Sequence, residues 1–389
     1  MLFKNIIGQA QVKEKLIQSV KENRVSHAQL FLGSPGSGDL ALALAYAQYI
    51  SCENRLEDDS CNSCLSCVKY NKLVHPDLHF VFPSNAPIKE GDNKKEVTKS
   101  RRMEFMDDWR HSVLENPYLE LYNWFENIQI ENKQAVITVH ESTEIIKLVS
   151  LKSYEAEYKV VIMWMAERMN EPASNKILKV LEEPPPKTLF ILLARNQEKI
   201  LPTIISRTQL IKISRLQDQE IIAALKSNHG ADEKEASVIA PLAEGNWNEA
   251  SRIMLNEEAA REQTDEYLLW MRNCFAFEKK ISELLDMGDD FADKKREKQK
   301  MFLQYSLHVT RECLMIHLKG FDLVRLSEAD KVSFGKFSQF IHPDNCAALA
   351  NAMSEAFYHI ERNANPKILF LDLSLKIGRL LRIKQPEMA

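Results

Sequence analysis

One glycine-rich segment sets the architecture of the first half of the chain: Gly33-Ser34-Pro35-Gly36-Ser37-Gly38-Asp39-Leu40. It follows an apolar run at 28–32, a predicted buried strand, and precedes residues 41–47, which are rich in strong helix formers. A strand, a glycine-rich loop and a helix in this order are the context of phosphate-binding loops. The segment therefore predicts a nucleotide-type loop, with Gly33, Gly36 and Gly38 as candidate phosphate-binding residues. A chance glycine-rich turn is the alternative.

The loop lacks the two residues that carry the chemistry. In the pattern G-x-x-x-x-G-K-[ST], lysine reaches the β- and γ-phosphates, and serine or threonine ligates magnesium. Asp39 and Leu40 stand in these places. A carboxylate about 4 Å from a phosphate charge costs about 1 kcal/mol in water and about 4 kcal/mol at an effective dielectric of 20. We therefore expect no ATP hydrolysis and no nucleotide binding at this loop, although its backbone N–H groups remain able to hold a phosphate.

A second part of a magnesium site is missing elsewhere in the sequence. Residues 158–163 predict a buried strand, which in a nucleotide-hydrolysing domain ends in carboxylates that hold magnesium-bound water. Here Trp164 and Met165 follow the strand. The loss of hydrolytic residues is thus seen at two independent places.

Strands and helices alternate through the first 200 residues. Strands are predicted at 28–32, 75–82, 158–163 and 188–194, and helices at 11–23, 41–47, 144–151 and 172–181. The last of these helices ends before Pro184-Pro185-Pro186, because a proline run cannot continue a helix. Alternation of this kind predicts an α/β domain with a parallel sheet covered on both faces.

Four of the seven cysteines form a cluster: Cys52, Cys61, Cys64 and Cys67 have the spacing C-x8-C-x2-C-x2-C. In a reducing compartment such a cluster predicts a metal site rather than disulfides. Four thiolates close a tetrahedral zinc site with no open position, so the expected role is structural. An iron–sulfur cluster is the alternative, but the spacing differs from the bacterial ferredoxin run. Cys274, Cys313 and Cys346 are expected in the core.

Composition limits the function classes. The chain has 389 residues, 45% of them hydrophobic and 27% charged, and a net charge of -4. This length allows two or three domains, and the slightly acidic charge gives no overall attraction to nucleic acid. A contact with DNA must then be local or made through partners. The sequence shows neither a signal peptide nor a run of 18 apolar residues, so we expect a cytoplasmic protein and no membrane partner.

The segment 84–134 interrupts the alternating pattern and is interpreted as an insertion. It contains a basic run at 94–102, followed by aromatic residues at Phe105, Trp109, Tyr118, Tyr122, Trp124 and Phe125. Basic residues beside aromatics suit a single nucleic-acid strand. The alternative is a solvated insertion whose aromatic side chains pack on the domain surface.

Several motifs together resemble the bacterial clamp-loader AAA+ ATPases. They are Ile6-Ile7-Gly8-Gln9, the loop at Gly33, the four cysteines, Leu181-Glu182-Glu183-Pro184-Pro185 and Ser206-Arg207-Thr208. The resemblance is dense over residues 1 to 215 outside the insertion and weak beyond. It implies a RecA-like AAA+ domain at 1–215 with a zinc module at 52–67, a helical lid at 216–257 and an all-α collar at 258–389 through which subunits assemble.

The resemblance also implies a division of labour. In the clamp loader of bacterial DNA polymerase III, gamma/tau subunits hydrolyse ATP, and a subunit with a decayed site donates an arginine to its neighbour. The Ser-Arg-Cys motif of the family falls on Ser206-Arg207-Thr208, which makes Arg207 the implied arginine finger acting in trans, with threonine departing from the motif. The implied partners are gamma/tau, delta, and through the complex the sliding clamp and primer–template DNA; polymerase activity lies in other subunits.

Two further motif positions concern nucleotide sensing. Where the lid of the motor subunits carries a sensing arginine, this sequence has Asn248 within Gly245-Asn246-Trp247-Asn248. The family also has a first nucleotide sensor, a polar residue that follows the strand predicted at 188–194. By the resemblance it falls on Arg195 or Asn196. The resemblance thus favours a non-hydrolysing clamp-loader subunit; the alternatives are a gamma/tau-like ATP-binding motor and a zinc-containing nucleic-acid-binding module.

Overall fold

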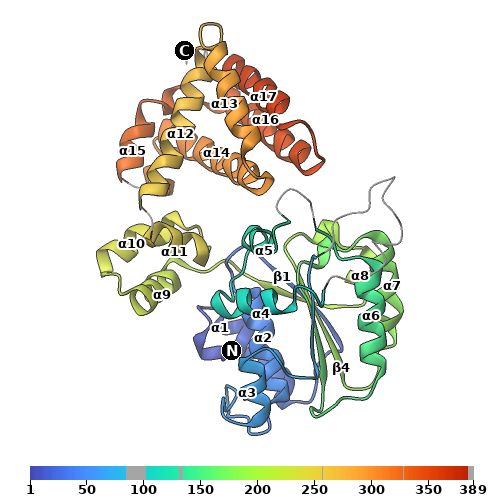
Figure 1. The fold of residues 1–389 in the computed structure, drawn as a ribbon. Helices are drawn as coiled ribbons and strands as arrows, with labels where there is room; N and C mark the ends of the chain where they lie inside the picture. The colour runs from blue at the N-terminus through green and yellow to red at the C-terminus, as the bar shows by residue number, and fades with distance from the viewer. Residues whose placement is uncertain (85–101, 131–134, 256, 327, 384–389) are drawn as a thin grey trace. The chain divides into compact units, whose positions relative to one another are not determined.

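The computed structural model describes residues 1–84, 102–130, 135–255, 257–326 and 328–383 (Figure 1). The chain divides into two compact units. The first unit comprises Met1–Glu233 and Ala243–Ala250, and the second comprises Lys234–Leu242 and Ser251–Ala389. The division into a domain at 1–215, a lid at 216–257 and a collar at 258–389 stays a prediction.

The first unit is built on a five-stranded parallel sheet. Its strands are β1 (Ala28–Gly33), β2 (Leu78–Val81), β3 (Lys159–Met163), β4 (Thr188–Ala194) and β5 (Gln209–Ile213). The strands lie in the order β2-β3-β4-β1-β5, and every neighbouring pair is parallel. In this register Leu30 of β1 lies between Leu192 of β4 and Leu210 of β5. The predicted parallel α/β sheet is therefore confirmed.

Two details of the sheet differ from the sequence-based expectation. β2 is shorter than the predicted strand 75–82, because the N–H of Asp77 donates to Nδ1 of His75 in the turn before it. β5 was not predicted. It is an edge strand with exposed Gln209 and Leu210, so it lacks the continuous apolar run that marks the central strands.

Helices connect the strands and cover the sheet. Those of the first part of the chain are α1 (Ala10–Lys21), α2 (Asp39–Ser51), α3 (Leu65–Asn71), α4 (Met106–Glu115), α5 (Leu121–Asn127), α6 (Val139–Ser150), α7 (Glu171–Glu182), α8 (Pro202–Ile205) and α9 (Asp218–His229), with short 3-10 turns η1 (Phe3–Asn5), η2 (Ala166–Arg168) and η3 (Gln197–Lys199). α6 begins earlier than predicted because Thr138 and Glu141 form a capping box.

Alternate residues of the strands pack against helices on opposite faces. Leu30, Val161 and Leu192 share one buried cluster with Ile145 of α6 and Ile177 of α7. On the other face, the side-chain amide of Gln29 donates to the hydroxyl of Tyr46 in α2 at 3.3 Å. Figure 1 shows α1 and α2 on one side of the sheet and α6 and α7 on the other. This layering leaves the carboxyl ends of the strands to carry the site.

In its described residues the second unit is all helical. Two of its helices, α10 (Glu233–Leu242) and α11 (Trp247–Leu255), begin in the first unit. The others are α12 (Glu257–Phe275), α13 (Ile281–Asp293), α14 (Arg296–His317), α15 (Glu328–Gly335), α16 (Pro343–Glu361) and α17 (Pro366–Leu381), with η4 (Phe321–Leu323) and η5 (Ser338–Phe340).

The second unit closes its core around α12 and α17. Trp270 stacks on Phe370 with ring centroids 5.2 Å apart, and its indole N–H donates to Ser374 Oγ at 2.8 Å. A Cβ at Gly378 would lie 2.2 Å from the carbonyl oxygen of Cys274, so only glycine permits this approach of the two helices. Within the described residues, no helix is both long and apolar enough to cross a membrane.

Candidate functional site

The glycine-rich loop adopts the strand–loop–helix geometry predicted for it. It leaves β1 at Gly33 and enters α2 through Gly38. Gly36 and Gly38 have φ angles of 66° and 88°, which residues with a Cβ rarely adopt. The two glycines are thus required by the turn itself, and the alternative of a chance glycine-rich turn gives no account of the surrounding strand and helix.

The residue in the lysine position makes a buried ion pair. Oδ1 of Asp39 lies 3.8 Å from Nη2 of Arg195, and the two side chains are 5% and 15% exposed. Arg195 follows β4 and is one of the two residues expected as the first sensor. The loop therefore carries a negative charge that is neutralised by this chain's own arginine.

The position after β3 is filled by an aromatic side chain. Trp164 is fully buried, and its ring lies 5.2 Å from that of Trp109 in α4. Trp109 in turn stacks on Phe82 at 4.5 Å and contacts Trp124 of α5 edge-on at 5.3 Å. An ionised carboxylate at position 164 would be buried among these rings without a partner, which is strongly unfavourable.

One carboxylate lies near the β3 end but was not identified from the sequence. Glu167 in η2 accepts a hydrogen bond from the backbone N–H of Arg195 at 2.9 Å. Burial raises the pKa of Glu167, although this hydrogen bond and the charge of Arg195 oppose the rise. Glu167 therefore fixes the backbone just after β4, at Arg195. It is not evident from the sequence because it lies four residues beyond Met163 and not directly after the strand.

Asn246 and Trp247 lie against the glycine-rich loop. The N–H of Trp247 donates to the carbonyl of Gly36 at 3.2 Å. Asn246 caps α11, because its Oδ1 accepts the N–H groups of Asn248 and Glu249 at 2.9 and 3.4 Å. Asn248, which stands where a sensing arginine was expected, donates instead to the carbonyl of Tyr118 at 2.7 Å.

The aromatic residues of the segment 84–134 are mostly internal. Trp109, Trp124, Phe125 and Tyr118 are all buried. They cover the carboxyl end of the sheet and cannot stack on nucleic-acid bases without unfolding. This burial agrees with the alternative in which the aromatic side chains pack on the domain, although these four are enclosed rather than lying on its surface. Most of the basic run, 94–101, lies outside the described residues.

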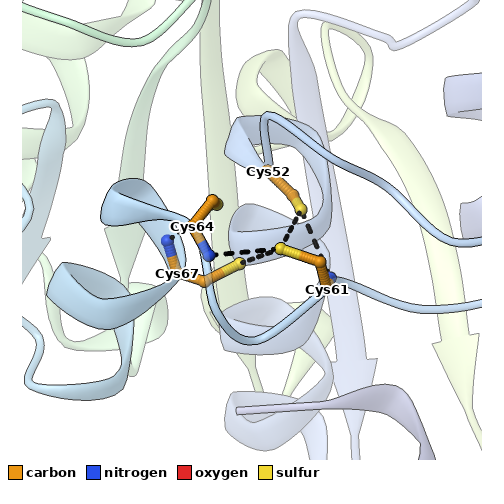
Figure 2. Close-up of side chains that lie close together, drawn as sticks. All are labelled: Cys52, Cys61, Cys64 and Cys67. Carbon is orange, nitrogen blue, oxygen red and sulfur yellow. Dashed lines mark hydrogen bonds between the residues drawn. The ribbon is translucent and has the colours of Figure 1, made fainter.

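The four clustered cysteines come together as predicted (Figure 2). Cys52 ends α2, Cys64 precedes α3 as its N-cap, Cys67 lies in α3, and Cys61 belongs to the loop between the helices. All four sulfur atoms lie within 4.8 Å of one another, with Cys52–Cys61 at 3.5 Å and Cys61–Cys67 at 3.9 Å. Sulfur atoms about 2.3 Å from a tetrahedral zinc lie about 3.8 Å apart, so this donor set fits the ion.

Backbone groups prepare the cluster for thiolates. The N–H of Cys64 points at the sulfur of Cys61 at 3.3 Å, and the N–H of Cys67 points at the sulfur of Cys64 at 3.4 Å. The backbone N–H groups of Ser63 and then Cys64 lower the pKa of Cys61 to about 6. Burial raises the pKa of Cys67. The remaining buried cysteines, Cys274 and Cys313, lie in the core as expected, whereas Cys346 is half-buried.

The implied arginine finger lies at the end of α8. The side chain of Arg207 is 32% exposed, and its Nη2 lies 3.2 Å from Oε2 of Glu182 at the end of α7. Its Nη1 also donates to the carbonyl of Thr203 at 3.1 Å. Ser206 is the C-cap of α8, and its hydroxyl donates to the same carbonyl at 3.1 Å. The Leu-Glu-Glu-Pro-Pro and Ser-Arg-Thr motifs thus meet in space through Glu182 and Arg207.

The sheet order and the loop between β1 and α2 define a domain of the AAA+ type of α/β fold, with Asp39 at the start of α2. A family profile described as DNA polymerase III, delta subunit, matches residues 8–217. This match covers more than half of the sequence, and the chain belongs to that family.

Individual relatives agree with the family match. The chain is 29% identical to DNA polymerase III subunit delta' of Bacillus subtilis (strain 168) over 215 residues, covering 55% of this chain and 50% of that protein. It is 26% identical to subunit delta' of Escherichia coli (strain K12) over 199 residues, covering 51% and 45%. Against subunit tau of Bacillus subtilis the identity is 24% over 257 residues, covering 65% and 37%.

These matches confirm the predicted resemblance to clamp-loader subunits and, among them, to delta-prime. The chain spans half or less of the length of these three relatives.

Proposed function

We propose that this chain is a non-hydrolysing, delta-prime-like subunit of the bacterial DNA polymerase III clamp loader, which helps place the sliding clamp on primed DNA. Its partners are the gamma/tau and delta subunits, and it reaches the clamp and the primer–template through the assembled complex. The observation that carries the proposal is that an acidic residue, Asp39, takes the lysine position of the loop and pairs with Arg195 of the same chain. A loop whose only charged side chain is already paired within the chain offers no cation for the phosphates that a motor subunit must bind.

The active contribution of the chain is Arg207, donated to the ATP site of a neighbouring gamma/tau subunit. Its guanidinium is accessible, and its bonds to Glu182 and to the carbonyl of Thr203 orient it. An arginine brought to the γ-phosphate stabilises the charge that develops in the transition state, an effect of about 10³- to 10⁵-fold in other nucleotide hydrolases. Ser206 ends α8 beside it and supports its position.

Zinc at Cys52, Cys61, Cys64 and Cys67 has a structural part in this proposal. It ties the end of α2 to α3 and closes with four protein ligands, so it offers no open position for a substrate. Two alternative functions are less well supported by the residues of the site. A gamma/tau-like motor needs the lysine and magnesium ligands that Asp39, Leu40 and Trp164 replace, and a nucleic-acid-binding module would use aromatic side chains that are buried.

The test is the clamp- and DNA-stimulated ATPase of the loader reconstituted with its partner subunits. Wild-type chain is compared with Arg207→Ala, and with Arg24→Ala as a matched control whose side chain is 81% exposed. Equal assembly of all three is checked by gel filtration. We expect normal assembly throughout and a large loss of turnover only for Arg207→Ala. Unchanged turnover with intact assembly would overturn the role of Arg207.

A further inference from the structure

The segment Asn116–Glu120, which links α4 to α5, lies against the glycine-rich loop. The ring of Tyr118 packs on Gly38 so closely that a Cβ there would lie 2.9 Å from Cε1 of the ring. The hydroxyl of Tyr118 accepts the N–H of Ile7 at 2.9 Å. Burial raises the pKa of Tyr118 to about 12. A neutral phenol therefore covers the N-terminus of α2, where a phosphate would have to approach.

The same segment holds the first turn of α11. Oε1 of Glu120 accepts hydrogen bonds from the side-chain amides of Asn246 at 3.2 Å and Asn248 at 3.0 Å. The amide of Asn116 donates to Oδ1 of Asn248 at 3.0 Å, and Asn248 donates to the carbonyl of Tyr118 at 2.7 Å. Three of the five residues of the segment, Asn116, Tyr118 and Glu120, thus bond to the start of α11.

The first turn of α11 also rests directly on the loop. Oδ1 of Asn246 comes so near Gly36 that a Cβ there would lie 1.8 Å from it, and the N–H of Trp247 donates to the carbonyl of Gly36. Side chains from two directions therefore fill the space beside Gly36 and Gly38. A nucleotide bound by the loop would need this same space for its phosphates.

In a motor subunit, three places contact ATP or its magnesium ion: the phosphate loop, the end of the strand that matches β3, and the sensing arginine of the lid. In this chain the residues at all three places contact one continuous segment, residues 109–120. Gly38 of the loop meets Tyr118, Trp164 after β3 meets Trp109, and Asn248 of α11 meets Asn116, Tyr118 and Glu120. These contacts come from the last two turns of α4 and the link that follows it.

We propose that the segment Asn116–Glu120 occupies the former nucleotide site as an internal ligand, and fastens the first turn of α11 to the glycine-rich loop without ATP or ADP. The proposal extends the non-hydrolysing part of the proposed function and does not depend on Arg207.

Hydrogen–deuterium exchange on the full chain tests the proposal. The amides to follow are those of residues 36–38 and 247–250, with β4 amides as a reference for global unfolding. In the wild type we expect slow exchange without nucleotide and no change with saturating MgATP or MgADP. Glu120→Ala and Tyr118→Ala are expected to raise exchange about tenfold at these amides and not in β4, because the fastening bonds are lost.

Matched controls separate this effect from general damage. Glu120→Gln keeps an acceptor oxygen, and Tyr154→Ala removes a tyrosine that is 83% exposed, so both are expected to exchange like the wild type. If Tyr118→Ala unfolds, as β4 exchange would reveal, Glu120→Ala supplies the result. Three results would overturn the proposal. The first two concern the wild type: slower exchange when MgATP is added, or saturable binding of a fluorescent ADP analogue. The third is exchange in Glu120→Ala as slow as in the wild type. An Arg207→Ala chain is expected to exchange normally, so failure of the finger role leaves this result unaffected.

Discussion

Nη2 of Arg195 and Oδ1 of Asp39 lie 3.8 Å apart in a largely buried pair that joins the end of β4 to the start of α2. The pair replaces the attraction between a lysine and a phosphate with an attraction inside the chain. The negative charge of Asp39 is also well placed at the N-terminus of a helix. The ion pair and the helix N-terminus therefore both favour an acidic residue at position 39.

Restoring the lysine alone is expected to destabilise the protein. In Asp39→Lys, two positive charges face each other where water has little access, and breaking a buried pair in this way costs about 3–5 kcal/mol. Urea unfolding of the first unit measures the loss, with the exposed Asp58→Lys as a control. Adding Arg195→Ala to Asp39→Lys is expected to recover part of it. If Asp39→Lys is as stable as the wild type, the pair does not contribute.

Zinc content is expected to depend on the clustered cysteines alone. The purified chain is expected to carry about one zinc ion, and Cys61→Ser close to none, because three thiolates no longer complete the tetrahedron. The half-buried Cys346→Ser is the control and keeps the metal. Elemental analysis gives the content, and thermal unfolding reports the accompanying loss of stability. Equal zinc in both variants would place the metal elsewhere.

Glu182 is expected to modulate Arg207 only weakly. Their ion pair is partly exposed, with Glu182 59% accessible, and such pairs contribute about 0–1 kcal/mol. Glu182→Gln frees the guanidinium for a phosphate, so we expect the ATPase of the reconstituted loader to rise by no more than about fivefold. A loss as large as that of Arg207→Ala would instead make Glu182 essential for positioning the arginine.

Asp77 is expected to make stability depend on pH. Burial alone would raise its pKa, but the backbone N–H groups of Ala156, Glu155 and Tyr154 bond the carboxylate at 2.6–2.8 Å and hold the pKa below its ordinary value of 3.8. A carboxyl whose pKa is lower in the folded state stabilises the fold above the unfolded-state pKa, and this contribution is lost as pH falls through the folded-state pKa.

The corresponding variant is Asp77→Asn. At neutral pH we expect it to lose about 1–3 kcal/mol relative to the wild type. The difference is expected to shrink below about pH 4, where the wild-type carboxyl also becomes protonated. Denaturant unfolding across this range measures it, and the exposed Asp58→Asn shows the background. A difference that is constant down to low pH would contradict the assignment to ionisation.

The sequence was sufficient for features that depend on neighbours along the chain. The central strands β1, β3 and β4 are short, mainly apolar runs, so their positions followed directly from the pattern. The cysteines lie within 16 residues, and their spacing alone allowed a closed metal site. That Asp39 and Trp164 differ from the lysine and the carboxylate of a nucleotide-hydrolysing domain was visible because a motif fixes which residue type each place requires.

Only the tertiary structure decided what replaces the missing groups. Arg195 lies 156 positions after Asp39, and Asn248 lies 128 positions after Glu120, so no local periodicity links either pair. Tyr118 belongs to a segment whose composition suited a solvated insertion, yet its ring covers Gly38. Local propensity sets which elements form, whereas the packing of the sheet's carboxyl end determines which distant side chains meet there. The sequence alone therefore determined that Asp39 and Leu40 stand where a phosphate-binding loop has lysine and serine or threonine, and the fold decided that the chain's own side chains fill the space beside the loop.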